Sequence, residues 1–278
     1  MTYKRILVTI DDTAASERRV AAACEIACRF DARVVGLYLA PPGPFDVDRA
    51  ELPPREIAAR ISEDALRDRV QSAFCDCAAA RGRGDVEVRV VEGDVVAQAI
   101  AEMRCVDLSV LSQSEAASGG AGFERRVAEQ AILANGGPIL FMPYAMATPT
   151  FRAERIVVAW DGGREAARSV RDALPLLKLA REVTVLSLGA HARLEQDARR
   201  SQERLAAYLR AHGIAPELRA LACTGAEAPE LLLSQLADLA ADVVVMGGYG
   251  HARVREIVLG GVTRTLLDSM TVPALMSH

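Results

Sequence analysis

Near the end of the chain stands the run Val243-Val244-Val245-Met246-Gly247-Gly248-Tyr249-Gly250-His251, and a second glycine pair, Gly260-Gly261, follows before Val262-Thr263. The apolar residues are typical of a buried parallel strand that ends at the glycines. Glycine lets a backbone approach a ligand closely, and a helix that begins behind glycine leaves its first N–H groups unpaired. Those N–H groups and the helix dipole attract anions. The pattern predicts a site for a phosphate-bearing ligand, a nucleotide first of all, between the two glycine clusters.

Turn formation alone is the other explanation for these glycines. One glycine pair would fit a simple turn, whereas two clusters that frame one crevice favour a ligand. His251 and Arg253 follow Gly250 directly. They either contact phosphate oxygens or lie as solvated charges on a loop. Both alternatives stay open at this point.

Composition limits the protein class. A chain of 278 residues with 51% hydrophobic residues is long enough for two domains with packed cores. The formal net charge of −4 disfavours nucleic-acid binding, which needs a basic face. Lys4 and Lys178 are the only lysines. Any phosphate contact must therefore come from arginine or from the backbone.

The sequence begins without a secretory signal pattern and has no apolar stretch of the roughly 18 residues that a membrane helix needs. We therefore expect a cytoplasmic protein that binds no membrane. A reducing compartment predicts free thiols for all six cysteines, which are Cys24, Cys28, Cys75, Cys77, Cys105 and Cys223.

An internal repeat organises the chain. Ile6-Leu7-Val8-Thr9-Ile10-Asp11 matches Ile156-Val157-Val158-Ala159-Trp160-Asp161 at an offset of 150, and Asp107-Leu108-Ser109-Val110 matches Asp242-Val243-Val244-Val245 at an offset of 135. The chain is a duplicated unit. We expect one domain over 1–146, a linker over 147–153 and a second domain over 154–278.

Short apolar segments alternate with amphipathic helical segments in each copy. The predicted strands lie near 4–10, 33–39, 85–91, 106–112 and 138–143, and in the second copy near 154–160, 182–188, 216–222, 242–248 and 272–277. The predicted helices lie near 14–30, 55–81, 94–104 and 123–135, and near 163–180, 192–212, 227–240 and 259–270. This alternation predicts an α/β fold of two tandem doubly wound parallel sheets, with ligand crevices at the carboxyl ends of the strands. The apolar last strands of the two copies would be exposed edges unless they faced each other.

The spacing Gly247-x2-Gly250-x9-Gly260, followed by a small residue, resembles the nucleotide-binding signature of the universal stress protein superfamily. Asp11 and Asp161, which end the first strand of each copy, also fit that family. Two copies in one chain are similar to its tandem bacterial members, and the resemblance covers nearly the whole sequence. It implies two five-stranded sheets with strand order 3-2-1-4-5, paired through their last strands, and ATP binding in members that keep the signature. We expect Mg2+ to accompany the ATP.

The resemblance also implies which residues surround the nucleotide. Ala159-Trp160-Asp161 would lie beside the adenosine, and the backbone of Val185-Leu186 would face the adenine edge. The glycines would line the ribose and phosphates. The complete candidate site contains Ala159, Trp160, Asp161, Val185, Leu186, Met246, Gly247, Gly250, His251, Arg253, Gly260, Gly261, Val262 and Thr263.

Three residues of this site allow more than one role. Asp161 accepts a ribose hydroxyl or helps to hold a divalent metal ion, or else caps the following helix, and the ligand role and the capping role can coexist. Trp160 either stacks on the base or fills the space. Gly261 stands where family binders carry serine or threonine, which removes a hydroxyl worth about 1.5–3 kcal/mol to a charged partner.

The first copy departs further from the signature. The four glycines of the second copy correspond to Ser112, Glu115, Arg125 and Arg126 at the offset of 135. A carboxylate in a phosphate site repels the ligand. We expect the first copy to be degenerate, with ATP bound by the second domain alone.

We expect a stress-response ATP-binding protein that acts through nucleotide-dependent conformation and protein interactions, as a homodimer with an unidentified protein partner. The alternative is an interaction scaffold that binds no nucleotide. An enzyme is the least favoured class, with slow ATP hydrolysis at most. No catalytic constellation or metal-ligand set can be identified, and neither a P-loop nor a dinucleotide fingerprint occurs.

Overall fold

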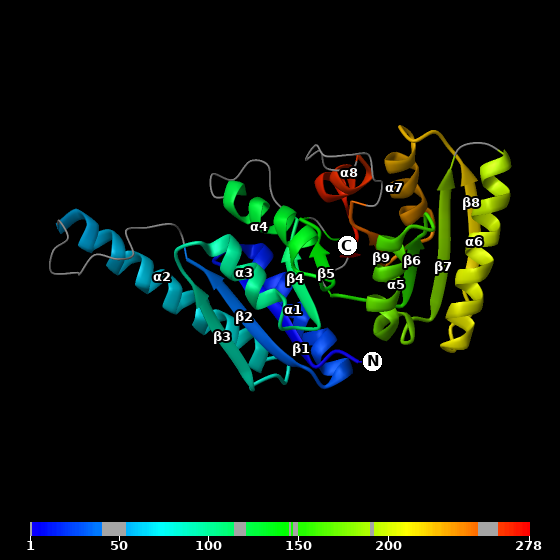
Figure 1. Ribbon diagram of the computed structural model, residues 1–278. Coiled ribbons are helices and arrows are strands. Elements are labelled where there is room, and N and C mark those ends of the chain that lie inside the picture. Colours follow the sequence, from blue (N-terminus) through cyan, green and yellow to red (C-terminus); the bar gives the residue numbers. More distant parts are fainter. Residues whose placement is uncertain are drawn as a thin grey trace. The chain divides into compact units, whose positions relative to one another are not determined.

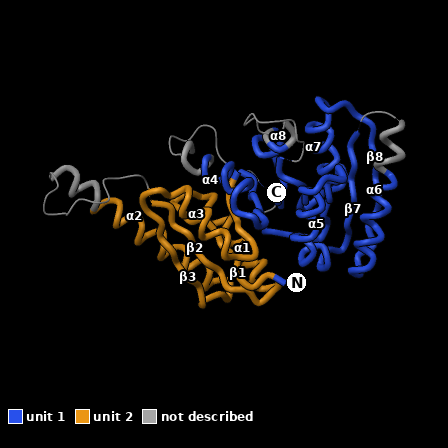
Figure 2. The backbone as a smooth tube through the Cα atoms, in the orientation of Figure 1, with its two compact units in different colours: residues 1–2, 113–278 blue, residues 3–112 orange. Residues whose placement is uncertain are grey.

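The computed structural model describes residues 2–40, 54–113, 121–144, 146, 150–189, 192–249 and 261–278 (Figure 1). The chain divides into two compact units, which Figure 2 colours separately. Unit 2 contains residues 3–112, and unit 1 contains residues 1–2 and 113–278.

Unit 2 alternates strands with helices. Its elements are β1 (Arg5–Ile10), α1 (Ala14–Phe30), β2 (Arg33–Leu39), α2 (Pro54–Ala79), β3 (Val86–Val91), α3 (Val95–Met103) and β4 (Leu108–Ser112). The strands are parallel, in the order β3-β2-β1-β4. Helices α1 and α2 pack against each other, and α3 contacts β2 and β3. The apolar runs of β1 and β2 form the core because both faces of these strands are covered.

Unit 1 contains the second copy together with the last helix and strand of the first. Its elements are α4 (Ala121–Ala134), β5 (Ile139–Met142), β6 (Arg155–Ala159), α5 (Arg164–Leu177), β7 (Glu182–Gly189), α6 (Ala192–Ala211), β8 (Glu217–Ala222), α7 (Ala228–Asp238), β9 (Val243–Gly247), α8 (Gly261–Ser269) and β10 (Ala274–Ser277). The strand order is β5-β10-β9-β6-β7-β8. All neighbours are parallel except β5 and β10, which are antiparallel with Leu140 opposite Leu275.

The fold class predicted from the sequence is confirmed. The second copy has its strands in the order 3-2-1-4-5, and the last strands of the two copies pair with each other. Each of these strands is fully buried, which removes the apolar edge that either would expose alone. The compact units separate after Ser112 because α4 and β5 belong with the second copy. The predicted domain limits at 146 and 154 stay a prediction.

Equivalent hydrogen bonds recur in the two copies. The carboxylate of Asp107 accepts from the backbone N–H of Lys4 and Arg5 at 2.7 and 2.9 Å. Asp242 accepts in the same way from Glu154 and Arg155 at 3.1 and 2.9 Å. Each aspartate thus fixes the start of the first strand of its own copy.

The carboxyl ends of α2 in the first copy and α6 in the second copy also have the same structure. Gly82 and Gly213, 131 positions apart, both have positive φ, 74° and 81°. The N–H of Arg83, which follows Gly82, donates to the carbonyl of Ala78. The N–H of Ile214, which follows Gly213, donates to the carbonyl of Leu209, again 131 positions along the chain. These two helices can therefore be compared residue by residue.

Within the part of the chain that the structure describes, no helix is long and apolar enough to cross a membrane. All six cysteines are free thiols.

Cys24 provides a test of the packing in unit 2. Its side chain is completely buried on α1, and burial raises the pKa of its thiol to about 12. Iodoacetamide at pH 8.5 should therefore label exposed Cys75 and Cys105 in the folded protein while leaving Cys24 unmodified. Peptide mass spectrometry measures this, with unfolded protein as the control in which all three react. Rapid labelling of Cys24 in the native protein would contradict the packing of α1.

Candidate functional site

The turn from β6 into α5 holds the first three candidate residues. Ala159 ends β6, and the backbone N–H of Trp160 donates to the carbonyl of Leu186 at 2.8 Å. The indole Nε1 of Trp160 donates to Ser201 Oγ of α6 at 2.9 Å. The ring is therefore held against α6, the helix that packs on β7 and β8. This hydrogen bond fixes the position of the indole ring.

Asp161 organises the start of α5. One carboxylate oxygen accepts from the N–H of Gly163 at 2.8 Å, and Gly162 between them has φ of 78°. The first copy repeats this turn, since Asp11 accepts from the N–H of Thr13 at 2.8 Å. The N-cap residues are Thr13 in α1 and Gly163 in α5, so each aspartate stands two positions before the cap and holds the turn that leads into the helix. The carboxylate remains exposed at the carboxyl edge of the sheet.

Val185 and Leu186 lie within β7 rather than at its end. Both side chains are buried. The carbonyl of Val185 accepts from Gln202 Nε2 at 3.2 Å, and that of Leu186 accepts from Trp160. These carbonyls already have partners in the unit, and the contact of this pair with an adenine edge stays a prediction.

The glycines at the end of β9 have packing roles. A Cβ on Gly247 would lie 2.7 Å from the backbone nitrogen of Ala166 and 2.8 Å from Cβ of Glu165, both at the start of α5. A Cβ on Gly248 would lie 2.6 Å from Cγ2 of Ile132 on α4. Close approach of two helices therefore requires both glycines, independently of any ligand.

A hydrogen bond brings the end of β9 to the beginning of α8. Tyr249 has φ of 57°, and its N–H donates to Thr263 Oγ1 at 3.4 Å. Thr263 is buried on the first turn of α8, next to Gly261 and Val262. Tyr249, two residues beyond the end of β9, therefore lies next to the first turn of α8. A ligand site formed by Met246, Gly247 and this helix stays a prediction. Gly250, His251, Arg253 and Gly260 lie outside the described residues.

Glu165 is a charged residue at this edge that the sequence analysis missed. Its side chain is buried beside Gly247 and forms an ion pair with Arg164. Burial alone would raise the pKa of this carboxyl, but Arg164, a backbone N–H and His278 outweigh burial and hold the pKa below its ordinary value. The group is therefore an anion at neutral pH, close to where a phosphate would approach. Its place in the first turn of a predicted helix was the available sequence signal.

The corresponding edge of the first copy contains a buried arginine. Arg19 on α1 donates from Nε to the carbonyl of Thr9 at 3.0 Å, and its guanidinium contacts Ser112 Oγ and the carboxylate of Asp11. Its side chain is 2% exposed. Ser112 is the counterpart of Gly247. The guanidinium thus joins the ends of β1 and β4, and uses the carboxylate that matches Asp161.

The other first-copy departures are less completely described. Glu115 lies outside the described residues, as does the side chain of Arg125, and Arg126 is exposed on α4. Among the described residues, no group of three or more histidines, cysteines, aspartates and glutamates is arranged to hold a metal ion.

Replacing Arg19 tests whether its guanidinium holds the ends of β1 and β4 together. Arg19→Met leaves the Asp11 carboxylate without its buried partner, and we expect a loss of roughly 3–5 kcal/mol in the free energy of unfolding. Arg67→Met, which removes partly exposed ion pairs with Asp64 and Glu92, is the matched control and should cost at most about 1 kcal/mol. Urea denaturation measures both. Equal effects of the two changes would contradict the account, and adding Asp11→Asn to Arg19→Met should recover part of the loss.

Gly247→Ala tests the packing explanation. The added methyl group meets backbone atoms of α5, so we expect a destabilisation of about 1–3 kcal/mol. Gly225→Ala is the control, because a Cβ there meets nothing within 4 Å. Thermal and urea unfolding should separate the two variants. A fully stable Gly247→Ala protein would show that α5 does not need this close approach.

Comparison with known proteins places these features in context. Residues 2–104 match the model of a family described as the universal stress protein family. No curated protein matches the sequence.

Solved structures share the fold over almost the whole chain. A universal stress protein from Archaeoglobus fulgidus DSM 4304 aligns with a TM-score of 0.73 and 17% identity, over 98% of this chain and 95% of that one. A candidate universal stress protein from Pseudomonas aeruginosa UCBPP-PA14 aligns with a TM-score of 0.59 and 16% identity, over 99% and 93% of the two chains. At these identities the likeness shows the fold alone.

Proposed function

We propose that the chain is a universal stress protein, the family whose model matches residues 2–104, and that its second copy binds ATP with Mg2+ at the carboxyl edge of unit 1. Binding changes the conformation around α8 and thereby the proteins that the chain contacts. The first copy binds no ATP at the corresponding edge. Homodimerisation, a protein partner and a cytoplasmic location are part of the same proposal.

The observation that carries this proposal is the hydrogen bond between Tyr249 and Thr263. It joins a glycine-ended strand to the first turn of α8, where backbone N–H groups and the helix dipole favour an anion. Asp161 is exposed at the same edge of unit 1. In the first copy, Arg19 occupies the matching aspartate, which supports a degenerate site there.

The scaffold without nucleotide is the second candidate, and two observations favour it. Gly247 and Gly248 are accounted for by packing against α5 and α4. The anionic side chain of Glu165 lies beside Gly247 and would repel phosphate. Arg164 neutralises part of that charge, so weakened binding is compatible with the same geometry.

Trp160 is the only tryptophan of the chain and supplies a local signal for the test. ATP with Mg2+ should change the fluorescence emission of Trp160 and raise the melting temperature of the protein. At an ATP concentration of 100 times the dissociation constant, binding adds about 2.7 kcal/mol to the free energy of unfolding. Thr263→Val removes the hydroxyl that accepts from Tyr249 and should weaken ATP binding up to about ten-fold, because one hydrogen bond is worth about 1 kcal/mol.

Thr184→Val provides the control for that variant. Thr184 is another buried threonine of unit 1, on β7 and away from α8. The Thr184→Val protein should bind ATP with the affinity of the unmodified protein. Absence of any thermal shift with millimolar ATP would reject nucleotide binding and leave the scaffold. Rapid release of phosphate over many turnovers would instead indicate an enzyme.

A further inference from the structure

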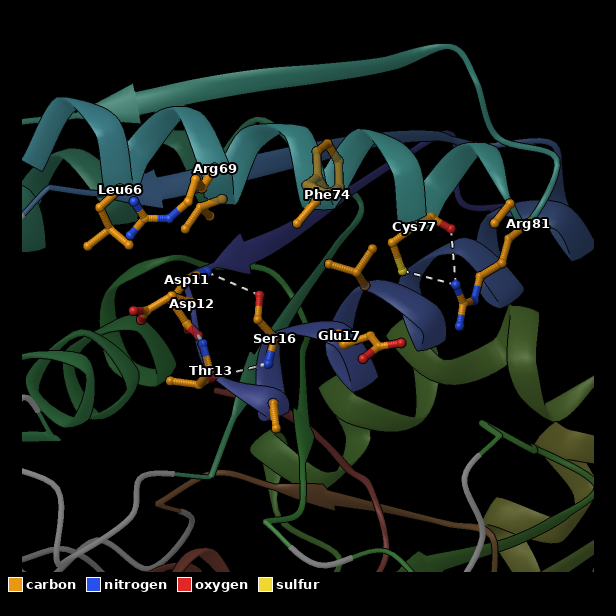
Figure 3. Close-up of a pocket in the computed structure, with 15 residues that line it drawn as sticks. Asp11, Asp12, Thr13, Ser16, Glu17, Leu66, Arg69, Phe74, Cys77 and Arg81 are labelled. Atoms are coloured by element: carbon orange, nitrogen blue, oxygen red, sulfur yellow. Dashed lines mark hydrogen bonds between the residues drawn. The ribbon is translucent and has the colours of Figure 1, made fainter.

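Unit 2 contains a cavity of about 630 Å³ between α1 and α2 (Figure 3). Its apolar wall is formed by Val20 of α1 together with Val70 and Phe74 of α2, all buried. Phe74 rests on Gly36 of β2, where an added Cβ would lie 2.9 Å from the ring. The volume falls in the usual range for small-molecule sites, roughly 300–1,000 Å³.

Opposite charges line the two rims of this cavity. Asp12 and Glu17 stand on the α1 side, and Arg69 and Arg81 stand on the α2 side (Figure 3). Within the described residues, Asp12, Glu17 and Arg69 take part in no ion pair. Arg81 donates from one guanidinium nitrogen to the carbonyl and to the sulfur of Cys77, both at 3.0 Å. Cys77 therefore lies at the α2 rim, beside a cationic group.

The second copy has the same groove between α5 and α6, but in a smaller form. There the cavity measures about 310 Å³ and is lined by Arg204 and Tyr208, with Trp160 bonded to Ser201. Arg204 and Tyr208 correspond to Ala73 and Cys77 at the offset of 131 that the helix ends establish. Smaller side chains on α2 thus leave about twice the space in the first copy.

The arrangement of charges restricts the ligand. A polyphosphate would face Asp12 and Glu17, and a polycation would face the two arginines. An uncharged apolar molecule would contact the apolar wall alone and would pair with neither charged rim. A molecule that carries an ammonium group and a carboxylate on an apolar body can pair with both charged rims and contact the apolar wall.

We propose that the α1–α2 cavity binds a zwitterionic small molecule with an apolar body, of the amino-acid or short-peptide class. Its ammonium group lies toward Glu17 and its carboxylate toward Arg81, at the Cys77 end of the cavity, and its side chains lie on Phe74 and its neighbours. This site is in unit 2 and does not depend on ATP binding in unit 1.

Protection of Cys77 from alkylation tests the proposal. The probe is the dipeptide leucyl-phenylalanine, and its N-acetylated, C-amidated form is the matched control without charges. Burial raises the pKa of the Cys77 thiol in spite of Arg81, so labelling with iodoacetamide is followed at pH 8.5 by peptide mass spectrometry. Millimolar dipeptide should slow the labelling of Cys77 at least five-fold and leave half-exposed Cys223 of unit 1 unchanged.

A groove-filling variant separates this site from adventitious protection. Ala73→Arg copies Arg204 of the second copy at an exposed position of α2 and should abolish the protection. Ala79→Arg, also exposed on α2 but not lining the cavity, should retain it. Melting temperatures of both variants establish that they are folded.

Four results would overturn the proposal. They are the absence of protection by the dipeptide, equal protection by the capped analogue, persistence of protection in Ala73→Arg, and equal protection of Cys77 by ATP. The last result would assign the cavity to a nucleotide, and failure of ATP to bind unit 1 would leave the dipeptide result unaffected.

Discussion

The first turn of α5 lies directly against the end of β9, and this approach is possible only because residue 247 has no side chain. Ser169 completes the joint, since its hydroxyl donates to the carbonyl of Met246 at 2.6 Å and accepts from the N–H of Ser277 at 2.9 Å. One small side chain therefore holds α5 to both β9 and β10. The carboxyl edge of unit 1 takes its form from this contact, because it fixes Glu165 beside Gly247 and sets the helix behind Asp161.

In the first copy, a different side chain joins the corresponding helix, α1, to the ends of the strands. Arg19 stands where the second copy has Ser169, and a long buried guanidinium replaces a short hydroxyl contact. Burying a cation requires an anion, so Asp11 is committed to an ion pair. The two copies thus share a fold while their strand-end aspartates have different surroundings. Between α1 and α2, small residues of the first copy enlarge a groove that Arg204 and Tyr208 narrow in the second.

The repeat was accessible from the sequence through short local patterns and their offsets, and the apolar last strands indicated that they face each other. The strand order was implied by the resemblance to the universal stress protein superfamily. The end of a strand at the glycines was predicted from the apolar run before them, and β9 ends at Gly247. What could not be predicted depends on contacts between distant positions. The direction of Trp160 is set by Ser201, the need for Gly247 is set by α5, and the cavity of unit 2 depends on Phe74 meeting Gly36. No local periodicity contains these pairs.

Amide hydrogen–deuterium exchange, with and without ATP and Mg2+, tests the central claim most directly, because the proposed ligand contacts are backbone N–H groups. The account predicts slower exchange in peptides that cover the end of β9 and the first turn of α8, with no change in α1 or β4 of the first copy. Unchanged exchange at Gly261 and Val262 under saturating ATP, or protection confined to unit 2, would contradict it.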